Sequence, residues 1–449
     1  MLKPLRQAPL PVTLLILAIL FPLGMAIELG GVLLPIYRLV IAIFFVPAVL
    51  KLITGPRIRI RSFDLLFLLY NLWTFGVFLM HLGVGSGLQF AGSLALEGFG
   101  GYVIARAYIR DEAAFKATVG VLLVAVTALG LLALPEAVFR VHFLHNYLGA
   151  RGGDAVADSD YVRMGLMRAA VSFEHPILYA SFCASILALV WFTETRRMRR
   201  WVSSGIIFGA TFLGLSSAPL NALGVQAGFA FLNRLTAGFP HRLKIAAGTA
   251  LTLYIFACLF SNQSPIAILA TKISFDSWTA YHRVLIWTYG LDNVMANALF
   301  GLGLNDWARP GWMHSTSVDA FWLLIPMRAG VPAIVLIVIA IWALMASVHT
   351  KFRRRRRALP MQRAAIGWTI SVTAMILLGL TVHYWNGVHA YLFFLLGMGG
   401  CFGDPLRRKA AAQAADAVVR PRVVPARLPR RPAYATSRAR MPELVIALR

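Results

Sequence analysis

Long apolar runs recur along almost the whole chain, and they constrain its fold more than any other feature. Most are about 18–22 residues long, roughly the length at which a helix crosses the ~30 Å hydrocarbon core of a bilayer. The chain has 449 residues, 59% of them hydrophobic and 14% charged, a balance typical of polytopic membrane proteins. We therefore expect an all-α transmembrane helix bundle of about twelve spans, at residues 10–28, 31–50, 63–82, 90–109, 117–135, 173–193, 202–217, 219–233, 245–261, 318–349, 364–383 and 389–402.

The positions of the charged residues predict how this bundle is oriented. A net charge of +25 could suggest a protein that binds nucleic acid, but most of the 43 Lys and Arg residues lie in alternate connections between the predicted spans. Cytoplasmic loops of membrane proteins carry such an excess of Lys and Arg. The bias therefore predicts that both termini are cytoplasmic, and it argues against a nucleic-acid partner.

Two predicted outer connections, residues 136–172 and 261–317, are much longer than the others. They suggest a crown over one outward-facing cavity, within a membrane domain that spans residues 1–402. Residues 403–449 are rich in Ala, Pro and Arg and cannot form a packed core, so we expect a disordered cytoplasmic tail that associates with anionic lipid headgroups. Pro219 and Asn221 predict a tight turn between two of the shorter spans.

The first set of candidate site residues lies at the end of the first long loop. Arg168 precedes Glu174 and His175, and Pro176 then opens the next predicted span. An arginine at a membrane surface can lie among the headgroups without binding any ligand. The outer connections contain few cations, however, so we single out Arg168, with Glu174 and His175 as supporting residues.

The second set lies in the second long loop. Arg283 and Trp287 are one helical turn apart, in a segment that resembles an amphipathic helix lying in the membrane interface. His314 follows a Gly-rich turn and stands shortly before Asp319 and the next span. A histidine at such an edge is more often a helix cap than a catalytic group, so His314 gains its interest from the arginines near it in the sequence.

Two ionisable residues fall inside predicted spans. Burial of Arg38 or Glu97 against lipid is costly, so both should face the bundle interior or a wet cavity. Arg38 would extend an anion-binding site inward. Glu97 would be either the structural partner of Arg38 or part of a proton path in a transporter.

These residue types together indicate one chemistry. Arginines that face a pocket hold a pyrophosphate through bidentate, charge-assisted hydrogen bonds. A histidine with a pKa near neutrality can accept a proton from a sugar hydroxyl. Transfer of a sugar from a lipid pyrophosphate requires these groups. The acidic residues are dispersed and the three cysteines lack metal-ligand spacing, so we expect no metal and no other cofactor.

The two residue sets resemble the signatures of a known family, the O-antigen ligase and polymerase superfamily of bacterial envelope glycosyltransferases. Arg168 followed by His175-Pro176 resembles the first signature. A larger set of residues, spread over the second long loop and the following span, resembles the second signature. The set comprises Arg283, Trp287, the segment 297–303, His314 and the segment 328–332. The resemblance covers a motif core of about residues 165–350.

The resemblance implies a GT-C-like bundle in the bacterial inner membrane, with its active site facing the periplasm. The donor would be an undecaprenyl-pyrophosphate-linked oligosaccharide, whose pyrophosphate Arg168 and Arg283 would bind while His314 activates the acceptor hydroxyl. Membrane lipids and other polysaccharide-assembly proteins, such as a chain-length regulator or a flippase, would be its partners. Ile177, the segment 217–219 and Ser315 depart from the family pattern, and the segment 217–219 lacks an arginine that members commonly have there.

Several functions fit these expectations. We favour polymerisation of exopolysaccharide or O-antigen repeat units, with ligation of O-antigen to the lipid A core as the alternative, because acceptor choice depends on cavity shape. A flippase for the same lipid would be expected to carry ionisable groups through the core, whereas here they gather in the outer loops. A non-catalytic assembly subunit is the third alternative.

Overall fold

The computed structural model describes residues 3–29, 32–55, 59–148, 161–236, 277–353 and 360–403. Within these residues the chain is mostly helical, and its strands form two short antiparallel hairpins. In the first hairpin β1 (Ile27–Leu29) pairs with β2 (Val32–Leu34), and in the second β3 (Val162–Arg163) pairs with β4 (Leu166–Met167). The fold is therefore an α-helical bundle, as the apolar runs predict.

The helices follow the predicted apolar runs. Those of the amino-terminal part are α1 (Lys3–Gln7), α2 (Leu10–Ile19), the 3-10 helix η1 (Leu23–Met25), α3 (Ile36–Thr54), α4 (Ser62–Leu82), α5 (Val84–Ala95), the π-helix η2 (Leu96–Gly100), α6 (Gly101–Tyr108), α7 (Glu112–Phe139) and α8 (Phe143–Leu148). Those that follow are α9 (Pro176–Ala184), α10 (Leu187–Thr193), α11 (Arg197–Leu213), α12 (Ser217–Leu235), α15 (Ser277–Ala296), α16 (Phe321–Arg353), α17 (Pro360–Leu378) and α18 (Asn386–Gly403).

Among the described residues, six helical segments are long and apolar enough to cross a membrane: Ile36–Thr54, Ser62–Leu82, Glu112–Phe139, Pro176–Thr193, Phe321–Thr350 and Pro360–Leu378. These segments indicate a membrane protein, but they do not confirm twelve spans. The predicted run 245–261, part of each long outer loop and the predicted tail lie outside the described residues. The side of the membrane that each end of the bundle faces stays a prediction.

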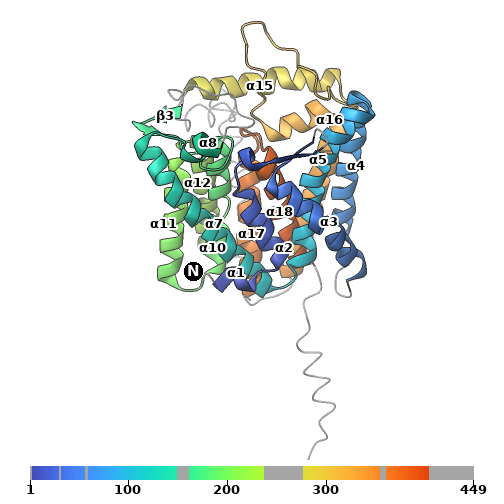
Figure 1. The fold of residues 1–449 in the computed structure, drawn as a ribbon. Helices are drawn as coiled ribbons and strands as arrows, with labels where there is room; N and C mark the ends of the chain where they lie inside the picture. Colours follow the sequence, from blue (N-terminus) through green and yellow to red (C-terminus); the bar gives the residue numbers. More distant parts are fainter. Residues whose placement is uncertain are drawn as a thin grey trace, which may run out of the picture. The chain divides into compact units, whose positions relative to one another are not determined.

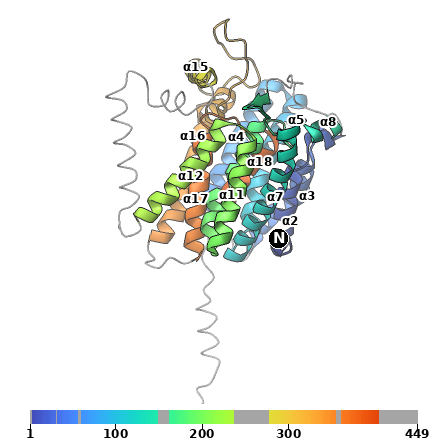
Figure 2. The same ribbon diagram turned by 90° about the vertical axis from the view of Figure 1, so that its left-hand side faces the viewer.

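The long helices run side by side, and α15 lies across one end of the bundle (Figures 1 and 2). Helix α4 packs against α16, α6 against α18, α7 against α11, and α10 against α17. The short helix α8 and the strand β3 lie near the end that α15 covers, whereas α1 lies at the opposite end (Figure 1). The two loops in which the sequence places its candidate residues therefore reach the same end of the bundle.

Three predicted details differ from the structure. The predicted span 10–28 is not one helix, because α2 ends at Ile19 and the rest contains η1 and the start of β1. The turn expected at Pro219 and Asn221 lies a few residues earlier, between the end of α11 at Leu213 and the start of α12 at Ser217. Pro219 is instead in the first turn of α12, where a missing backbone N–H costs nothing because that N–H has no partner within the helix. The predicted span 90–109 is not one regular helix either, because the π-helix η2 joins α5 to α6.

Candidate functional site

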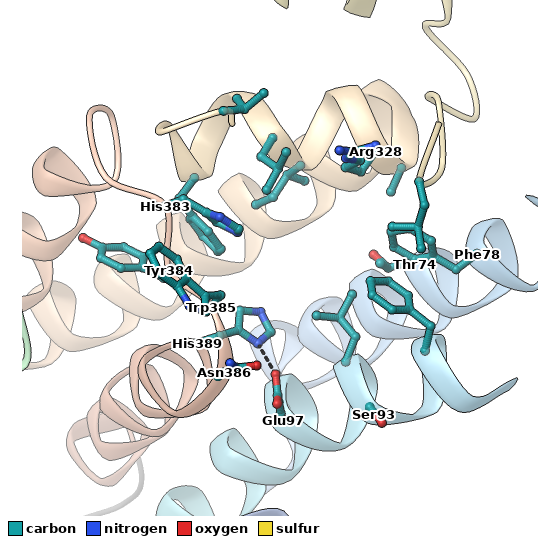
Figure 3. Close-up of a pocket in the computed structure, with 18 of the residues that line it drawn as sticks. Thr74, Phe78, Ser93, Glu97, Arg328, His383, Tyr384, Trp385, Asn386 and His389 are labelled. Carbon is teal, nitrogen blue, oxygen red and sulfur yellow. Dashed lines mark ion pairs between the residues drawn. The ribbon is translucent and has the colours of Figure 1, made fainter. Parts of the chain in front are cut away.

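A cavity of about 620 Å³ opens between α4, α5, η2, α16 and the loop that joins α17 to α18 (Figure 3). Its lining is mixed, with apolar residues such as Phe78 and Leu324 beside polar ones such as Thr74 and Asn386. The charged or ionisable residues in the lining are Arg38, Glu97, Arg328, His383 and His389, with the phenols of Tyr70 and Tyr384. A cavity of this size and composition is typical of a binding site.

The buried carboxylate of Glu97 organises one wall of this cavity. Tyr37 donates its hydroxyl to Oε1 of Glu97 at 2.6 Å, and Nε of Arg38 donates to the same oxygen at 2.7 Å. Nδ1 of His389 lies 3.3 Å from Oε2, and this ion pair is the dashed line in Figure 3. We call these four residues the Glu97 centre. The prediction that Glu97 is the partner of Arg38 is confirmed.

Glycines beside Glu97 allow this close packing. A Cβ on Gly101 would lie 2.5 Å from the carbonyl oxygen of Ala390, so only glycine lets α6 approach α18 this closely. That approach brings His389 of α18 next to Glu97. Single π-helical turns inside α-helices occur frequently at functional sites, and here η2 carries the carboxylate.

Arg163, Arg168 and Arg283 form a second group, which we call the arginine cluster. Arg168 is only 8% exposed, and burial followed by the nearby charge of Arg163 lowers its pKa to about 10. Arg283, on α15, is close enough to contribute to that shift, and burial lowers the pKa of Arg283 as well. Two segments more than a hundred residues apart in the sequence thus bring three guanidinium groups together.

The backbone turn between α11 and α12 holds two members of the cluster. Nη1 of Arg163 donates to the carbonyl of Leu215 at 3.2 Å, and Nε of Arg168 donates to the carbonyl of Gly214 at 3.4 Å. By contrast, Nε of Arg283 is buried and has no hydrogen-bond partner among the described residues. Part of the donor capacity of the cluster is therefore free for a ligand.

Asp319 is the acid nearest to this cluster in electrostatic terms. Its negative charge acts to raise the pKa of Arg283, His175 and His383, against the larger lowering by burial. Its Oδ1 accepts a hydrogen bond from Ser317, which lines the cavity. None of the three arginines lines the cavity. Asp319, which directly follows the lining residues Ser317 and Val318, links Arg283 to the cavity.

Glu174 and His175 occupy the space between the cluster and the cavity. Nδ1 of His175 accepts the backbone N–H of Ile177 at 3.1 Å, so this histidine caps α9. Burial, followed by the charge of Arg168, lowers the pKa of His175 to about 4. Glu174 accepts a hydrogen bond from Asn386 of the cavity lining at 3.1 Å, and burial raises its pKa.

The two parts of the predicted second signature meet at a kink in α16. Gly330 has a φ of 79°, and a Cβ there would lie 2.0 Å from the carbonyl oxygen of Leu299. The backbone N–H groups of Leu302 and Gly303 donate to the carbonyls of Met327 and Arg328 at 2.7 and 3.1 Å. The Gly-rich turn and the kink are thus joined by backbone hydrogen bonds. This close approach requires glycine at position 330, because any side chain there would clash with the backbone of Leu299.

That turn also fixes a cavity residue and leads to His314. Nη1 of Arg328 donates to the carbonyls of Gly303 and Asn305 at 2.9 and 2.7 Å. The side chain of His314 is exposed, and Thr316, two residues later, lines the cavity. His314 is therefore outside the cavity lining and outside both the Glu97 centre and the arginine cluster.

Two of the remaining predicted residues have structural contacts. Trp287 donates its indole N–H to the carbonyl of Leu380 at 2.9 Å, which ties α15 to the end of α17. Arg38 lines the cavity, but Glu97 neutralises its charge, so it extends the site inward with less free charge than expected.

Sequence reasoning missed Arg163, Arg328 and His389. The feature that singled out Arg168 also applies to Arg163, because both are cations in predicted outer loops that contain few cations. His389 is the first residue of a predicted span, where an ionisable side chain is uncommon. Its contact with Glu97 depends on tertiary packing between α6 and α18, and no sequence pattern predicts it.

Comparison with known proteins adds no assignment to this geometry. No protein-family description matches the chain, and no curated protein matches it either. The interpretation of the site therefore rests on the residues themselves: a cavity with a compensated buried carboxylate, and three arginines of which one has an acid nearby.

Proposed function

We propose that this chain is a membrane glycosyltransferase that uses a polyprenyl-pyrophosphate-linked glycan as donor and polymerises repeat units. The observation that carries the proposal is the arginine cluster, in which three guanidinium groups act on one another's charge and Asp319 acts on Arg283 alone. One buried and two half-buried arginines that lack an acid for each favour an anionic ligand. A pyrophosphate matches such a cluster because each arginine can donate two parallel hydrogen bonds to its oxygens.

The donor would bind with its pyrophosphate at Arg168, Arg283 and Arg163. Arg163 reaches the turn directly before residues 217–219, where the family that the sequence resembles commonly has an arginine, and so would supply the third guanidinium. These groups are preorganised by the backbone turn that two of them contact, so little reorganisation is needed as charge develops on the leaving group.

The acceptor would enter the cavity, where hydroxyl and amide groups offer hydrogen bonds to a sugar. Its hydroxyl oxygen forms a bond to the anomeric carbon of the donor, while the bond from that carbon to the pyrophosphate oxygen breaks. The pyrophosphate leaves with the electron pair and the configuration inverts. His314, two residues before the lining residue Thr316, accepts the proton of the hydroxyl. The Glu97 centre would shape the inner wall of the acceptor site rather than take part in the transfer, because its carboxylate is already paired.

The lipid-linked glycans of a deletion strain test this proposal. The strain would be complemented with the wild type, with Arg168→Ala, Arg283→Ala or His314→Ala, or with Arg197→Ala, which alters an exposed arginine of α11 as a control. We expect single repeat units to accumulate on the lipid carrier with the first three variants, at wild-type protein levels, and normal polymer with the control. Normal polymer from all three site variants would overturn the assignment of the site.

The same profile separates the alternatives. Full-length polymer that stays on the carrier, with none on the lipid A core, would indicate a ligase. Units that stay on the cytoplasmic leaflet would indicate a flippase. One observation favours that second candidate function, because Arg38, Glu97 and His389 form an ionisable group within the helical bundle, as a transporter's proton path would.

A further inference from the structure

A group of metal-binding side chains lies at the end of α7, apart from the cavity. Glu136 of α7 and His142 and His145 around α8 each offer one ligand atom, and these three atoms lie within 4.8 Å of one another. Glu136 is 2% exposed and His142 is 12% exposed. From the sequence we expected no metal, because the acids are dispersed. The two histidines, three residues apart, supply donors that this expectation did not consider.

The geometry of Glu136 and His142 differs from that of a hydrogen bond. Nδ1 of His142 lies 3.1 Å from Oε1 of Glu136, yet this buried nitrogen has no aligned hydrogen-bond partner among the described residues. Two ligands of a tetrahedral zinc ion, each about 2.0–2.1 Å from the metal, are about 3.3 Å apart. The observed separation fits two ligands of one ion.

The surrounding contacts orient the ligands as outer groups do in metal sites. Oε2 of Glu136 accepts the backbone N–H groups of Ala170 and Val171 at 3.0 and 2.8 Å, which leaves Oε1 for the metal. His145 has a backbone hydrogen bond at Phe173, which orients its ring. The ring centroids of His142 and His145 are 5.8 Å apart.

We propose that Glu136, His142 and His145 bind a zinc ion through two imidazole nitrogens and one carboxylate oxygen, with a fourth position left for water. This donor set and number of ligands are ones that Zn²⁺ takes in proteins. The site is independent of the glycosyltransferase proposal, because none of its residues lines the cavity.

A zinc ion here would hold the segment that carries Arg168. Residues 170–173 contact Glu136 and His145, and Val171 has a φ of 56°, which is unfavourable for a β-branched residue. Arg168 lies two residues before these residues, and His175 lies two residues after them. Coordination would fix α8 to α7 around the strained backbone and so set the position of Arg168.

Zinc binding by the purified full-length chain in detergent, with any affinity tag removed, tests this inference. Wild type, Glu136→Gln, His142→Ala and His145→Ala would be titrated with Zn²⁺ by calorimetry after chelator treatment, with His349→Ala as the matched control because that histidine is exposed on α16. Cobalt substitution would report the geometry through visible absorption.

We expect wild type and His349→Ala to bind one equivalent of Zn²⁺ and to gain thermal stability from it. Each ligand variant should bind at least tenfold more weakly and lose that gain, and the cobalt form should show intense tetrahedral absorption. Wild-type protein that binds no zinc saturably would overturn the inference, whether or not the variants fold. Unchanged binding in all three ligand variants would overturn it as well, because the metal would then lie elsewhere.

Discussion

The arginine cluster and the Glu97 centre are neighbours of one cavity, but their charges are balanced differently. In the Glu97 centre, Arg38, Tyr37 and His389 surround one carboxylate, and every contact is between groups of the protein. In the arginine cluster three guanidinium groups repel one another, and Nε of Arg283 has no partner among the described residues. The charge of the first region is balanced within the protein, whereas the second carries an excess of positive charge that the proposed anion would balance.

This difference separates residues that stabilise the fold from residues that bind a ligand. Removal of one partner of a buried ion pair leaves an uncompensated charge and is strongly destabilising. Removal of one of several like charges has no such cost, because it relieves repulsion. Stability and ligand affinity should therefore respond in opposite ways in the two regions.

The largest expected effect is the contrast between Glu97→Ala and Arg283→Ala. Glu97→Ala leaves Arg38 unpaired and should lower the free energy of unfolding by about 3–5 kcal/mol. Arg283→Ala should leave it unchanged or raise it, but weaken inorganic pyrophosphate binding about 10–100-fold, as expected for loss of a hydrogen bond to a charged group at about 1.5–3 kcal/mol. Thermal unfolding in detergent, with and without pyrophosphate, measures both effects.

Glu112→Gln is the control for this contrast. Glu112 pairs with Lys116 on the surface of α7, where both side chains are more than a third exposed, so its loss should cost less than about 1 kcal/mol. A loss of stability in Arg283→Ala as large as that in Glu97→Ala would show that the cluster is a structural ion network, and the distinction between the two regions would fail.

The sequence predicts the class of fold well and its irregular elements poorly. Apolar runs predict helices because burial of apolar side chains in lipid or in a bundle needs hydrogen-bonded backbone throughout. The π-helix at Glu97 and the kink at Gly330 depend instead on backbone contacts with α18 and with the turn near Leu299. Such contacts join residues distant in the chain, so a local pattern does not reveal them.

The same limit applies to the site. Arg168 and Arg283 were singled out because they are cations in predicted outer loops. In the structure the charge of Arg283 contributes to the lowered pKa of Arg168. The role of His175 as a cap could be predicted from its place before Pro176, yet its buried environment could not. His314 was chosen by its position in a signature, and its exposed side chain outside the cavity lining gives that choice no structural support.

The fall in stability at acid pH gives a second, smaller test. It concerns His175, which lies between the arginine cluster and the cavity. His175 has a pKa of about 4 in the folded chain, below the usual 6.5, so the unfolded chain binds its proton first as pH falls. The resulting stability loss begins near pH 6.5, is complete near pH 4 and amounts to roughly 3 kcal/mol. His175→Asn should remove this part of the loss, because asparagine also caps helices but does not ionise.

Melting temperatures of His175→Asn and wild type between pH 7 and 4 measure this contribution. The difference between them is the informative quantity, because His383 has a pKa of about 4 and adds a loss of the same sign, while Glu174, with a raised pKa, adds a change of opposite sign. His349→Asn, at an exposed position, should follow the wild type. An unchanged pH profile in His175→Asn would show that this imidazole is not desolvated.

The smallest expected effect concerns the contact that holds α15 in place. Trp287→Phe keeps most of the packing but removes the hydrogen bond to the Leu380 carbonyl, which should cost about 1 kcal/mol of stability. Arg283 lies one turn away on the same helix, so pyrophosphate affinity should fall only about two- to fivefold as the helix loosens. Trp342→Phe, on an exposed part of α16, should change neither quantity. If Trp287→Phe weakened pyrophosphate binding as much as Arg283→Ala, the indole would contact the anion itself, and the boundary of the arginine cluster would have to include it.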